Sequence, residues 1–358
     1  MKVLVIANYD LGLYKFRKEL LQTLLEEGHE VVIALPYGKL VDPLIEIGCT
    51  FREIPMERRG MNPIKDLELL IRYYKLIQQE KPDKVLTYTI KPNIYGGWVS
   101  RWCKVPYYAN ITGLGTAFQG EGVLKRMIIF LYKGALRKAS IVFFENGENR
   151  AIFLKYGIVS SEQAIGLHGA GVNLEEYPYM CMHFDGHLKF LFIGRLMKEK
   201  GIEEFFNVAR RIKVEFPYVD FEVVGPFEED YKETIERLES QGIIHYHGYQ
   251  TDVKPFVESS HCFVLPSYHE GMANTLLEAA AMGRPLITSD IPGCREAVYH
   301  NGYTVKVQDE EALYNKVKSY IEIDIEDKIE MGIQSRKHME DKFDKKKIVE
   351  KTLEYMEA

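Results

Sequence analysis

The sequence has few cysteines and no long run of apolar residues. Its five cysteines are scattered over 358 residues and form no Cys-x-x-Cys pair, so neither a disulfide framework nor a zinc ribbon is predicted. No apolar stretch approaches the roughly 20 residues that a transmembrane helix needs. The opening MKVLVIANYD becomes polar too early for a signal peptide and is predicted to be a first strand. We therefore expect reduced thiols and a cytoplasmic protein.

The pattern of metal-binding residue types is also incomplete. His245 and His247 alternate along one predicted strand and share a face of it. His183 and His187 lie in a stretch without periodicity, and no cysteine or carboxylate completes a ligand set. No Asp-x-Asp motif lies in a loop after a predicted strand. We therefore expect structural histidines, no metal and no cofactor.

The chain is long enough for two domains of ordinary size, and its charge is divided unevenly. The formal net charge is −6; residues 1–178 carry 23 Lys and Arg against 19 Asp and Glu, and the rest carry 23 against 33. The basic N-terminal half suggests an anionic partner, such as a phosphate or an acidic membrane surface. Unevenly charged solvated faces explain the numbers equally well. We expect no nucleic-acid partner.

Apolar strands and amphipathic helices alternate along the sequence, and the alternation restarts near residue 188. Because the strands are continuously apolar, we expect parallel sheets covered on both faces. The fold class predicted is α/β: two Rossmann-like, doubly wound domains that face one another across a cleft, with ligands at the strands' carboxyl ends. The domains are expected at 1–172 and 173–340, and a C-terminal helix, 341–358, is expected to pack back on the first domain.

The stretch FIGRLMKEKG, residues 192–201, ends a predicted strand at Gly194 and opens a helix at Gly201. A loop that leads from a strand to a helix N-terminus is a natural anion site. Arg195 and Lys200 stand five residues apart in this loop and could neutralise a diphosphate, with Arg195 binding bidentately. Plain surface charge is the alternative for both.

The stretch HEGMANTLLEAAAMGRP, residues 269–285, places two carboxylates eight residues apart. Glu270 is expected in the loop after a strand, and Glu278 about two turns into the next helix. A carboxylate accepts two hydrogen bonds and suits paired sugar hydroxyls; alternatively, Glu278 pairs with a nearby cation such as Arg284. The first N–H groups of the helix lack an acceptor within it and could hold a phosphate or a sugar hydroxyl. They belong to Met272, Ala273, Asn274 and Thr275.

Three stretches, GRLMKEKG, EGMANTLLE and GRPLITSDIPGCREAV, resemble in order and spacing the C-terminal half of family-4 glycosyltransferases. These are retaining enzymes of the GT-B fold that use nucleotide-sugar donors without a metal. The resemblance covers nearly the whole chain. It implies that Glu270 contacts the donor sugar and Glu278 the nucleotide ribose. It also implies that Arg195 and Lys200 bind the diphosphate.

The resemblance therefore implies a catalytic set and a wider donor-binding set. The catalytic residues are Glu270, Arg195 and Lys200. The donor-binding residues are Gly12, Arg195, Lys200, Glu270, Gly271, Met272, Ala273, Asn274, Thr275 and Glu278. Many relatives carry Phe and Gly where this chain has Met272 and Ala273, a change that would reshape the sugar pocket.

The N-terminal half resembles bacterial enzymes that build capsule, exopolysaccharide or other glycans on a polyprenyl-diphosphate carrier. The stretches LGLYKFRKEL, KPNIYGGWVSRWCKVPYYANITGLGTAF and FFENGENRAIFLKYGI carry this likeness. Gly12 is expected in the loop after the first strand, where the backbone can approach a ligand closely. Acceptor contacts are expected from Arg17, Thr112 and Asn146. A surface arginine and a helix N-cap are the alternatives for Arg17 and Asn146, and many relatives have a histidine in place of Thr112.

The segment 122–139 is a predicted helix that is both basic and apolar. A basic amphipathic helix can lie on an anionic membrane, while an ordinary helix with one face in the core is the alternative. A lipid-linked acceptor favours the membrane, and we expect peripheral contact with the inner leaflet. Its cations are Lys125, Arg126, Lys133, Arg137 and Lys138.

The resemblance thus predicts a retaining glycosyltransferase of bacterial surface polysaccharide or glycan assembly. It would move a hexose or N-acetylhexosamine from a nucleotide sugar, by family habit a UDP-sugar, to a polyprenyl-diphosphate-linked saccharide. Two alternatives remain open at this point. One is a GT-B epimerase that acts on a UDP-sugar without an acceptor, and the other is a non-catalytic nucleotide-sugar-binding protein.

Overall fold

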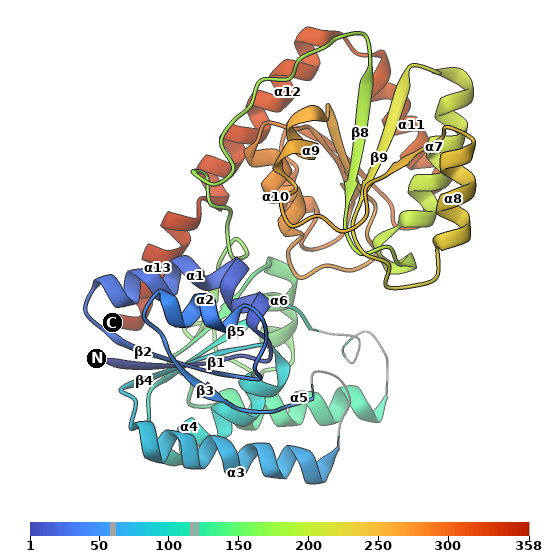
Figure 1. Cartoon of the computed structure of the whole chain (residues 1–358). Helices are drawn as coiled ribbons and strands as arrows, with labels where there is room; N and C mark the ends of the chain where they lie inside the picture. The colour runs from blue at the N-terminus through green and yellow to red at the C-terminus, as the bar shows by residue number, and fades with distance from the viewer. Residues whose placement is uncertain (58–61, 115–117, 119–121, 358) are drawn as a thin grey trace. The chain divides into compact units, whose positions relative to one another are not determined.

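The computed structural model describes residues 1–57, 62–114, 118 and 122–357. The chain forms two compact units, one of Met1–Ala170 with the residues from Lys346 onward, the other of Gly171–Lys345. Each unit has one parallel sheet with helices on both faces (Figure 1). The α/β class and the doubly wound layout predicted from the sequence are confirmed.

The first unit's sheet has seven strands in the order β3-β2-β1-β4-β5-β6-β7. The order changes direction between β1 and β4, which pair in parallel, and such switch points are where open α/β sheets bind ligands. The strands are β1 (Lys2–Ile6), β2 (Glu30–Leu35), β3 (Thr50–Glu53), β4 (Lys84–Tyr88), β5 (Tyr107–Ile111), β6 (Ile141–Phe144) and β7 (Ala164–Gly166).

Alternate residues of each central strand enter different cores, because side chains alternate across a sheet. Val3 and Val5 of β1 pack in a core shared with α1, α2 and α13, whereas Leu4 and Ile6 pack in one shared with α3 and α5. The helices are α1 (Asp10–Glu26), α2 (Val41–Glu46), α3 (Pro63–Glu80), α4 (Gly97–Cys103), α5 (Val123–Leu136), α6 (Gly147–Lys155) and α13 (Lys345–Glu357), with a π-helical turn, η1 (Pro92–Gly96), before α4.

Two local features of the first unit differ from the sequence prediction. α1 begins at Asp10, so Gly12 lies in the first turn of the helix and not in a loop. Tyr9 at the N-cap makes no side-chain capping bond, so the sequence holds no capping signal at this start. The helical segment η1–α4 was not predicted, because Pro92 and the Gly96–Gly97 pair are typical of a turn.

The C-terminal helix α13 belongs largely to the first unit. Its Ile348, Leu353 and Met356 are buried in the core with β1 and β2. The hydroxyl of Tyr108 on β5 donates a hydrogen bond to the carbonyl of Met356 at 3.0 Å. Among the described residues, no helix is long and apolar enough to cross a membrane.

The second unit's sheet has six parallel strands in the order β10-β9-β8-β11-β12-β13, so its switch point lies between β8 and β11. The strands are β8 (Leu188–Ile193), β9 (Val219–Val224), β10 (His245–Tyr246), β11 (Cys262–Leu265), β12 (Leu286–Ser289) and β13 (Gly302–Val305). The helices are α7 (Ile202–Glu215), α8 (Lys232–Ser240), α9 (Lys254–Ser259), α10 (Asn274–Ala281), α11 (Glu310–Glu322) and α12 (Ile325–His338), with short turns η3 (Lys198–Lys200), η4 (Arg295–Ala297) and η5 (Met339–Phe343).

Candidate active site

A lysine and a glutamate meet at the switch point of the second unit. Lys200 ends the turn η3 that follows β8, and Glu270 lies in the loop between β11 and α10. The Lys200 Nζ lies 2.5 Å from Oε1 of Glu270, and the two side chains are only 19% and 11% exposed. The hydroxyl of Ser267 donates to the same oxygen at 2.9 Å. The sheet therefore brings together two oppositely charged groups that stand 70 residues apart.

Gly201 fixes the position of Lys200 against the neighbouring loop. Its φ is +71°, and a Cβ there would lie 2.1 Å from the carbonyl oxygen of Pro266. The N–H of Tyr268 also donates to the carbonyl of Glu199 at 2.9 Å. Only glycine accepts this backbone conformation and this approach at little cost, so the loops after β8 and β11 are held side by side.

Arg195 follows β8 in the same loop but has a different partner. Its Nη1 lies 3.1 Å from Oε1 of Glu228, and both side chains are exposed. Exposed ion pairs of this kind contribute little to stability. The structure therefore pairs Lys200 with Glu270, while Arg195 remains an exposed cation whose guanidinium can be diverted to a ligand at small cost.

The N-terminus of α10 follows Glu270 and offers donors to an anion. Among the described residues, the N–H groups of Met272, Asn274 and Thr275 have no hydrogen-bond acceptor. The prediction that Ala273 also has a free N–H is wrong, because this group donates to the carbonyl of Gly293 at 2.8 Å. That contact depends on a tertiary turn which the local sequence does not reveal.

Glu278 lies on α10 beside a tyrosine. Because the helix begins at Asn274, Glu278 is little more than one turn into it and not two. Burial, together with the nearby carboxylate of Glu278, raises the pKa of Tyr177. Glu278 is half-buried, which is compatible with access by a ligand.

The alternative pairing of Glu278 with Arg284 is wrong. Arg284 is fully buried, and its Nη2 donates to the carbonyl of Met180 at 2.8 Å. Its Nε and Nη1 have no hydrogen-bond partner among the described residues. Burial lowers the pKa of Arg284 to about 10. The cation that the sequence offered as a partner is thus a core residue.

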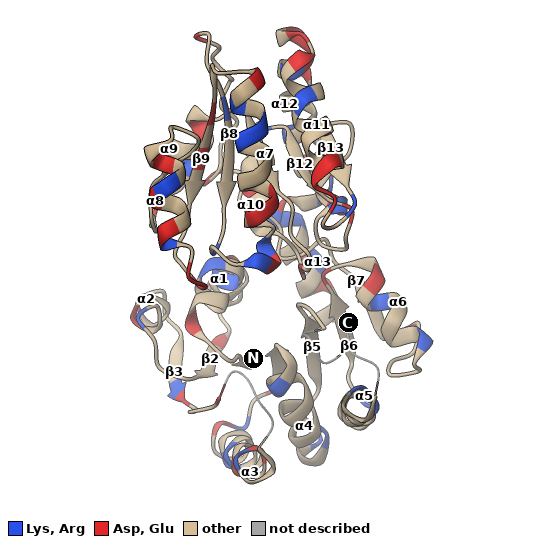
Figure 2. Ribbon diagram, turned by 90° about the vertical axis from the view of Figure 1, so that its right-hand side faces the viewer, with Lys and Arg blue, Asp and Glu red and all other residues tan. Residues whose placement is uncertain are grey.

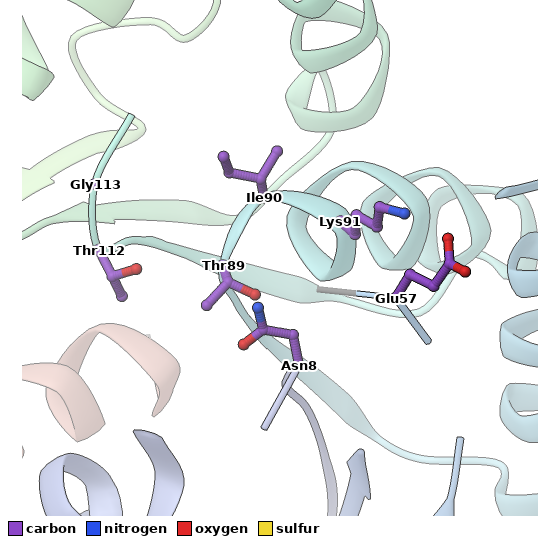
Figure 3. Close-up of a pocket in the computed structure, with 7 residues that line it drawn as sticks. All are labelled: Asn8, Glu57, Thr89, Ile90, Lys91, Thr112 and Gly113. Atoms are coloured by element: carbon purple, nitrogen blue, oxygen red, sulfur yellow. The ribbon is translucent and has the colours of Figure 1, made fainter. Parts of the chain in front are cut away.

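The first unit has a pocket of about 200 Å³ at its own switch point (Figure 3). Asn8 follows β1, Thr89 follows β4 and Thr112 follows β5, and Figure 3 shows their polar ends turned toward the same space. The Oδ1 of Asn8 and the Oγ1 of Thr89 are buried and have no hydrogen-bond partner in the described chain. The pocket is lined by Asn8, Glu57, Thr89, Ile90, Lys91, Thr112 and Gly113.

The charged groups of this pocket are already compensated. The Nζ of Lys91 lies 3.0 Å from Oδ1 of Asp66, and Glu57 is paired with Lys65. Thr89 has a φ of +74°, an uncommon backbone conformation for a β-branched residue. The pocket therefore presents an unsatisfied amide oxygen and an unsatisfied hydroxyl, the latter on a residue of uncommon backbone conformation, but no free charge from these two pairs.

The remaining predicted acceptor residues have structural partners. Arg17 is buried, forms an ion pair with Glu145, and lies 4.9 Å from the ring centre of Tyr88. A surface position for Arg17 is therefore wrong. Burial raises the pKa of Glu145, and the neighbouring guanidinium opposes that rise. Asn146 caps α6, since its side chain accepts from the N–H of Asn149 at 2.8 Å.

Possible metal ligands gather elsewhere. Within the described residues, the one cluster of three close His, Cys or acidic side chains consists of Glu27, His29 and Glu357 in the first unit. His247, singled out in the sequence, instead pairs with Glu222. Neither group includes Lys200 or Glu270.

The sequence missed several residues around these sites. Ser267 ends the predicted strand before Glu270, and its place beside the carboxylate could have been inferred from that position. Tyr177 lies in the segment without periodicity, where nothing signals a contact with Glu278. Asn8 and Thr89 each end a predicted strand, but only the pairing of β1 with β4 brings them together.

Two glycosyltransferase family models match the chain. "Glycosyl transferase 4-like" matches residues 2–146, and "Glycosyl transferases group 1" matches residues 187–322. The chain is 25% identical over 90% of both lengths to N,N'-diacetylbacillosaminyl-diphospho-undecaprenol alpha-1,3-N-acetylgalactosaminyltransferase of Campylobacter jejuni. It is 28% identical, over 73% of this chain and 72% of the relative, to UDP-Gal:alpha-D-GlcNAc-diphosphoundecaprenol alpha-1,3-galactosyltransferase of Escherichia coli.

Solved structures share the fold over the whole chain. A glycosyltransferase from Rickettsia africae aligns with a TM-score of 0.81 at 18% identity, covering 99% of this chain and 98% of that one. Anabaena Alr3699/HepE in complex with UDP and glucose aligns with a TM-score of 0.80 at 15% identity, covering 100% and 99%. The chain therefore belongs to the glycosyltransferases of the GT-B fold and is a hexosyltransferase.

Proposed function

We propose that this enzyme transfers a hexose or N-acetylhexosamine from a UDP-sugar to a polyprenyl-diphosphate-linked saccharide, with retention of configuration. The names of the Campylobacter and Escherichia relatives, which act on undecaprenyl-diphosphate sugars, support this substrate class. The UDP and glucose in the Anabaena structure support the donor. The observation that carries the proposal is the meeting of Lys200 with Glu270 in front of α10.

The donor diphosphate would lie between the loop after β8 and the start of α10. Lys200 and Arg195 supply positive charge there, and the N–H groups of Asn274 and Thr275 donate to phosphate oxygens. Glu270 holds Lys200 in place before the donor binds and then accepts hydrogen bonds from hydroxyls of the donor sugar. Gly271, Met272 and Ala273 shape the adjoining loop.

The nucleotide ribose would be bound by Glu278. A carboxylate can accept a hydrogen bond from each of the two free hydroxyls of a ribose. Tyr177 lies near this carboxylate and would act as a positioning residue, not as a direct ligand. Glu270 would thus contact the sugar and Glu278 the ribose of one nucleotide sugar, on opposite sides of the diphosphate.

The chemistry requires one bond to break and one to form. The bond between the sugar C1 and the phosphate oxygen breaks, and its electron pair goes to the leaving UDP. The acceptor hydroxyl oxygen bonds to C1 from the same face, and its proton goes to the leaving phosphate. Lys200 and the α10 N–H groups stabilise the charge that develops on that phosphate. In this proposal these groups replace a metal, so chelators should leave the rate unchanged.

The first unit would bind the acceptor saccharide in the pocket at β1, β4 and β5. The Thr89 hydroxyl can donate or accept, but the Oδ1 of Asn8 also lacks a partner and requires a donor, which a sugar hydroxyl or an acetamido N–H supplies. An anionic diphosphate supplies none, and Lys91 is already paired with Asp66. The pocket therefore suits the neutral sugar end of the acceptor. Thr112 lines it as a further contact.

Arg17, Asn146 and Gly12 have weaker support as ligand contacts. Arg17 lies against Glu145, so binding an acceptor phosphate would require this pair to open. The side-chain oxygen of Asn146 already accepts a hydrogen bond from the N–H of Asn149 at the start of α6. Gly12 stays a predicted donor contact; in the first turn of α1 a Cβ at this position would lie 2.9 Å from the ring of Tyr9.

The test is incubation with a panel of UDP-sugars and a short-chain polyprenyl-diphosphate disaccharide, followed by NMR of the product. We expect one new glycosidic bond with the anomeric configuration of the donor. Inversion would overturn the retaining mechanism. An epimer formed without acceptor would favour the epimerase, and donor binding without any transfer would favour a non-catalytic binding protein.

A further inference from the structure

Exposed apolar side chains form a continuous stripe along α3. Ile64, Leu67, Ile71 and Tyr74 follow one another at intervals of three and four residues, which places them on one face of the helix. All four are exposed, and Ile64 is 73% exposed. The opposite face of α3 is the one that packs in the core, through residues such as Leu69 and Leu76. The stripe is therefore not needed to hold the helix on the sheet.

A second apolar stripe lies on α5. Val123, Met127 and Phe130 recur at the same helical spacing, and Val123 and Phe130 are 82% and 69% exposed. Ile128 and Tyr132 on the other face are buried in the core. Like α3, α5 thus presents one apolar face to its sheet and another to the outside.

The helix α4 joins the two stripes. Gln78 of α3 donates to Sγ of Cys103 at 3.4 Å, and the indole of Trp98 donates to the carbonyl of Leu131 on α5 at 3.2 Å. Trp102 is exposed and lies edge-on to Trp98, with ring centroids 5.7 Å apart. Figures 1 and 2 show α3, α4 and α5 on the same side of the first unit's sheet.

Basic side chains outnumber acidic ones beside this apolar surface, and on α5 all the charged side chains are basic. The helix α5 carries no acidic residue, and Figure 2 shows only basic residues along it. Its segment 122–139 contributes Lys125, Arg126, Lys133, Arg137 and Lys138. On α3, Lys75 is exposed beside the apolar stripe, whereas the exposed Arg72 is paired with Glu68 at 3.6 Å. An exposed apolar area with a basic border is electrostatically complementary to an anionic lipid surface.

We propose that this α3–α5 face, defined by Ile64, Leu67, Ile71, Tyr74, Trp102, Val123, Met127 and Phe130, docks on an anionic membrane. The apolar side chains would enter the headgroup region and the cations would meet lipid phosphates. Tryptophan favours this interface, because its ring is apolar and its N–H is polar. Two helices and a tryptophan thus share the contact that the sequence alone assigned to 122–139. The docking is independent of the proposed transfer reaction.

The chain offers a direct optical reporter, since its two tryptophans, Trp98 and Trp102, both lie on α4. The test is titration with vesicles of phosphatidylcholine alone or with 30 mol% phosphatidylglycerol, without donor or acceptor, read by tryptophan emission and by co-sedimentation. We expect a blue shift and at least tenfold tighter binding to the anionic vesicles, weakened by salt. A Trp102→Phe variant should lose most of the blue shift and keep most of the binding.

Matched variants separate the two helices. Ile64→Glu/Leu67→Glu and Val123→Glu/Phe130→Glu replace exposed residues and should each weaken vesicle binding at least fivefold. Val214→Glu, at an equally exposed residue of α7 in the second unit, should change nothing. Wild-type protein that ignores anionic vesicles would overturn the proposal, and an effect of the α5 pair alone would remove α3 from it.

A second copy of the chain is the competing occupant. If this face is a dimer interface, light scattering should show a dimer that the glutamate variants dissociate, and that result would also overturn the proposal. Transfer to a water-soluble, short-chain acceptor should stay within twofold of wild type in both double variants. Loss of that activity in the wild type would count against the proposed function and not against docking.

Discussion

Replacing Lys200 by alanine removes the cation that the structure places at the second unit's switch point. At 2.5 Å from Glu270, and with an effective dielectric constant of about 20, the gross attraction of the pair is about 7 kcal/mol. The substitution removes the desolvation cost of Lys200 but leaves the carboxylate of Glu270, only 11% exposed, without its cation, so we expect the free energy of unfolding to fall by about 3 kcal/mol. The protein should therefore remain folded.

The effect on catalysis should be larger than the effect on stability. Lys200 would face the leaving diphosphate, and loss of one such electrostatic contact costs about 3–4 kcal/mol of barrier, or a 10²- to 10³-fold fall in kcat. Initial rates at saturating donor, together with denaturant unfolding, measure both quantities. Lys198→Ala is the matched control, because this exposed lysine lies in the same turn and is paired with Glu203. It should stay within twofold of wild type.

The reasoning fails if Lys200→Ala keeps more than a third of the wild-type kcat. It also fails if Lys198→Ala loses as much activity as Lys200→Ala, because general positive charge in the turn would then matter and not the contact with Glu270. Retention of circular dichroism and of the unfolding cooperativity in both variants shows that the comparison concerns catalysis.

Three further predictions follow from single contacts. Glu278→Gln should raise the KM for the donor by about tenfold or more, because a hydrogen bond to a charged group is lost. Tyr177→Phe should raise this KM less. If steady-state assays give Glu278→Gln the same KM as wild type, Glu278 does not belong to the donor site. Gly293→Ala should destabilise the fold by about 2–4 kcal/mol and weaken UDP binding, because the φ of Gly293 is +82° and a Cβ there would lie 2.5 Å from the carbonyl oxygen of Gly271. The control is Gly28→Ala, at a residue with a similar φ and no neighbour within reach of a Cβ. It should lower the free energy of unfolding in urea by only about 1 kcal/mol and leave UDP binding unchanged. Burial raises the pKa of Glu145 above its ordinary value, so the carboxyl stays protonated to a higher pH in the folded state than in the unfolded state. The free energy of unfolding of wild type, relative to that of Glu145→Gln, should therefore fall as the pH rises from about 4.5. A relative free energy of unfolding that rises with pH would contradict the assignment.

Much of the fold was readable because it depends on local pattern. Apolar runs such as LKFLFI, residues 188–193, predicted buried parallel strands, and the structure has β8 at those residues. The loop positions of Arg195, Lys200 and Glu270 followed from the strands that precede them. Because strand carboxyl ends meet at one edge of a parallel sheet, the approach of Lys200 to Glu270 was a consequence of topology.

The rest depends on contacts between segments far apart in sequence. The sequence offered Arg284 as a cation that could pair with Glu278, yet tertiary packing buries it completely. The carbonyl of Gly293, in a turn that follows β12, accepts a hydrogen bond from the N–H of Ala273. The pocket at Asn8 and Thr89 exists because β1 pairs with β4, not with β3. No spacing rule along the chain contains this information.

Exposure was the property least accessible to pattern reading. The stripe from Ile64 to Tyr74 has the same helical period as a core face, and only the structure shows that Leu69 and Leu76 take the core side. When a helix has two apolar faces, periodicity alone does not show which face packs in the core and which is exposed.

The mass of a lipid-linked acceptor after incubation with a UDP-sugar tests the central claim most directly. The wild-type enzyme and Lys198→Ala should each raise that mass by one hexose or N-acetylhexosamine residue. Lys200→Ala, compared at the same early time, should leave most of the acceptor unchanged. An acceptor whose mass never rises with any UDP-sugar, or rises equally in Lys200→Ala, would contradict the account.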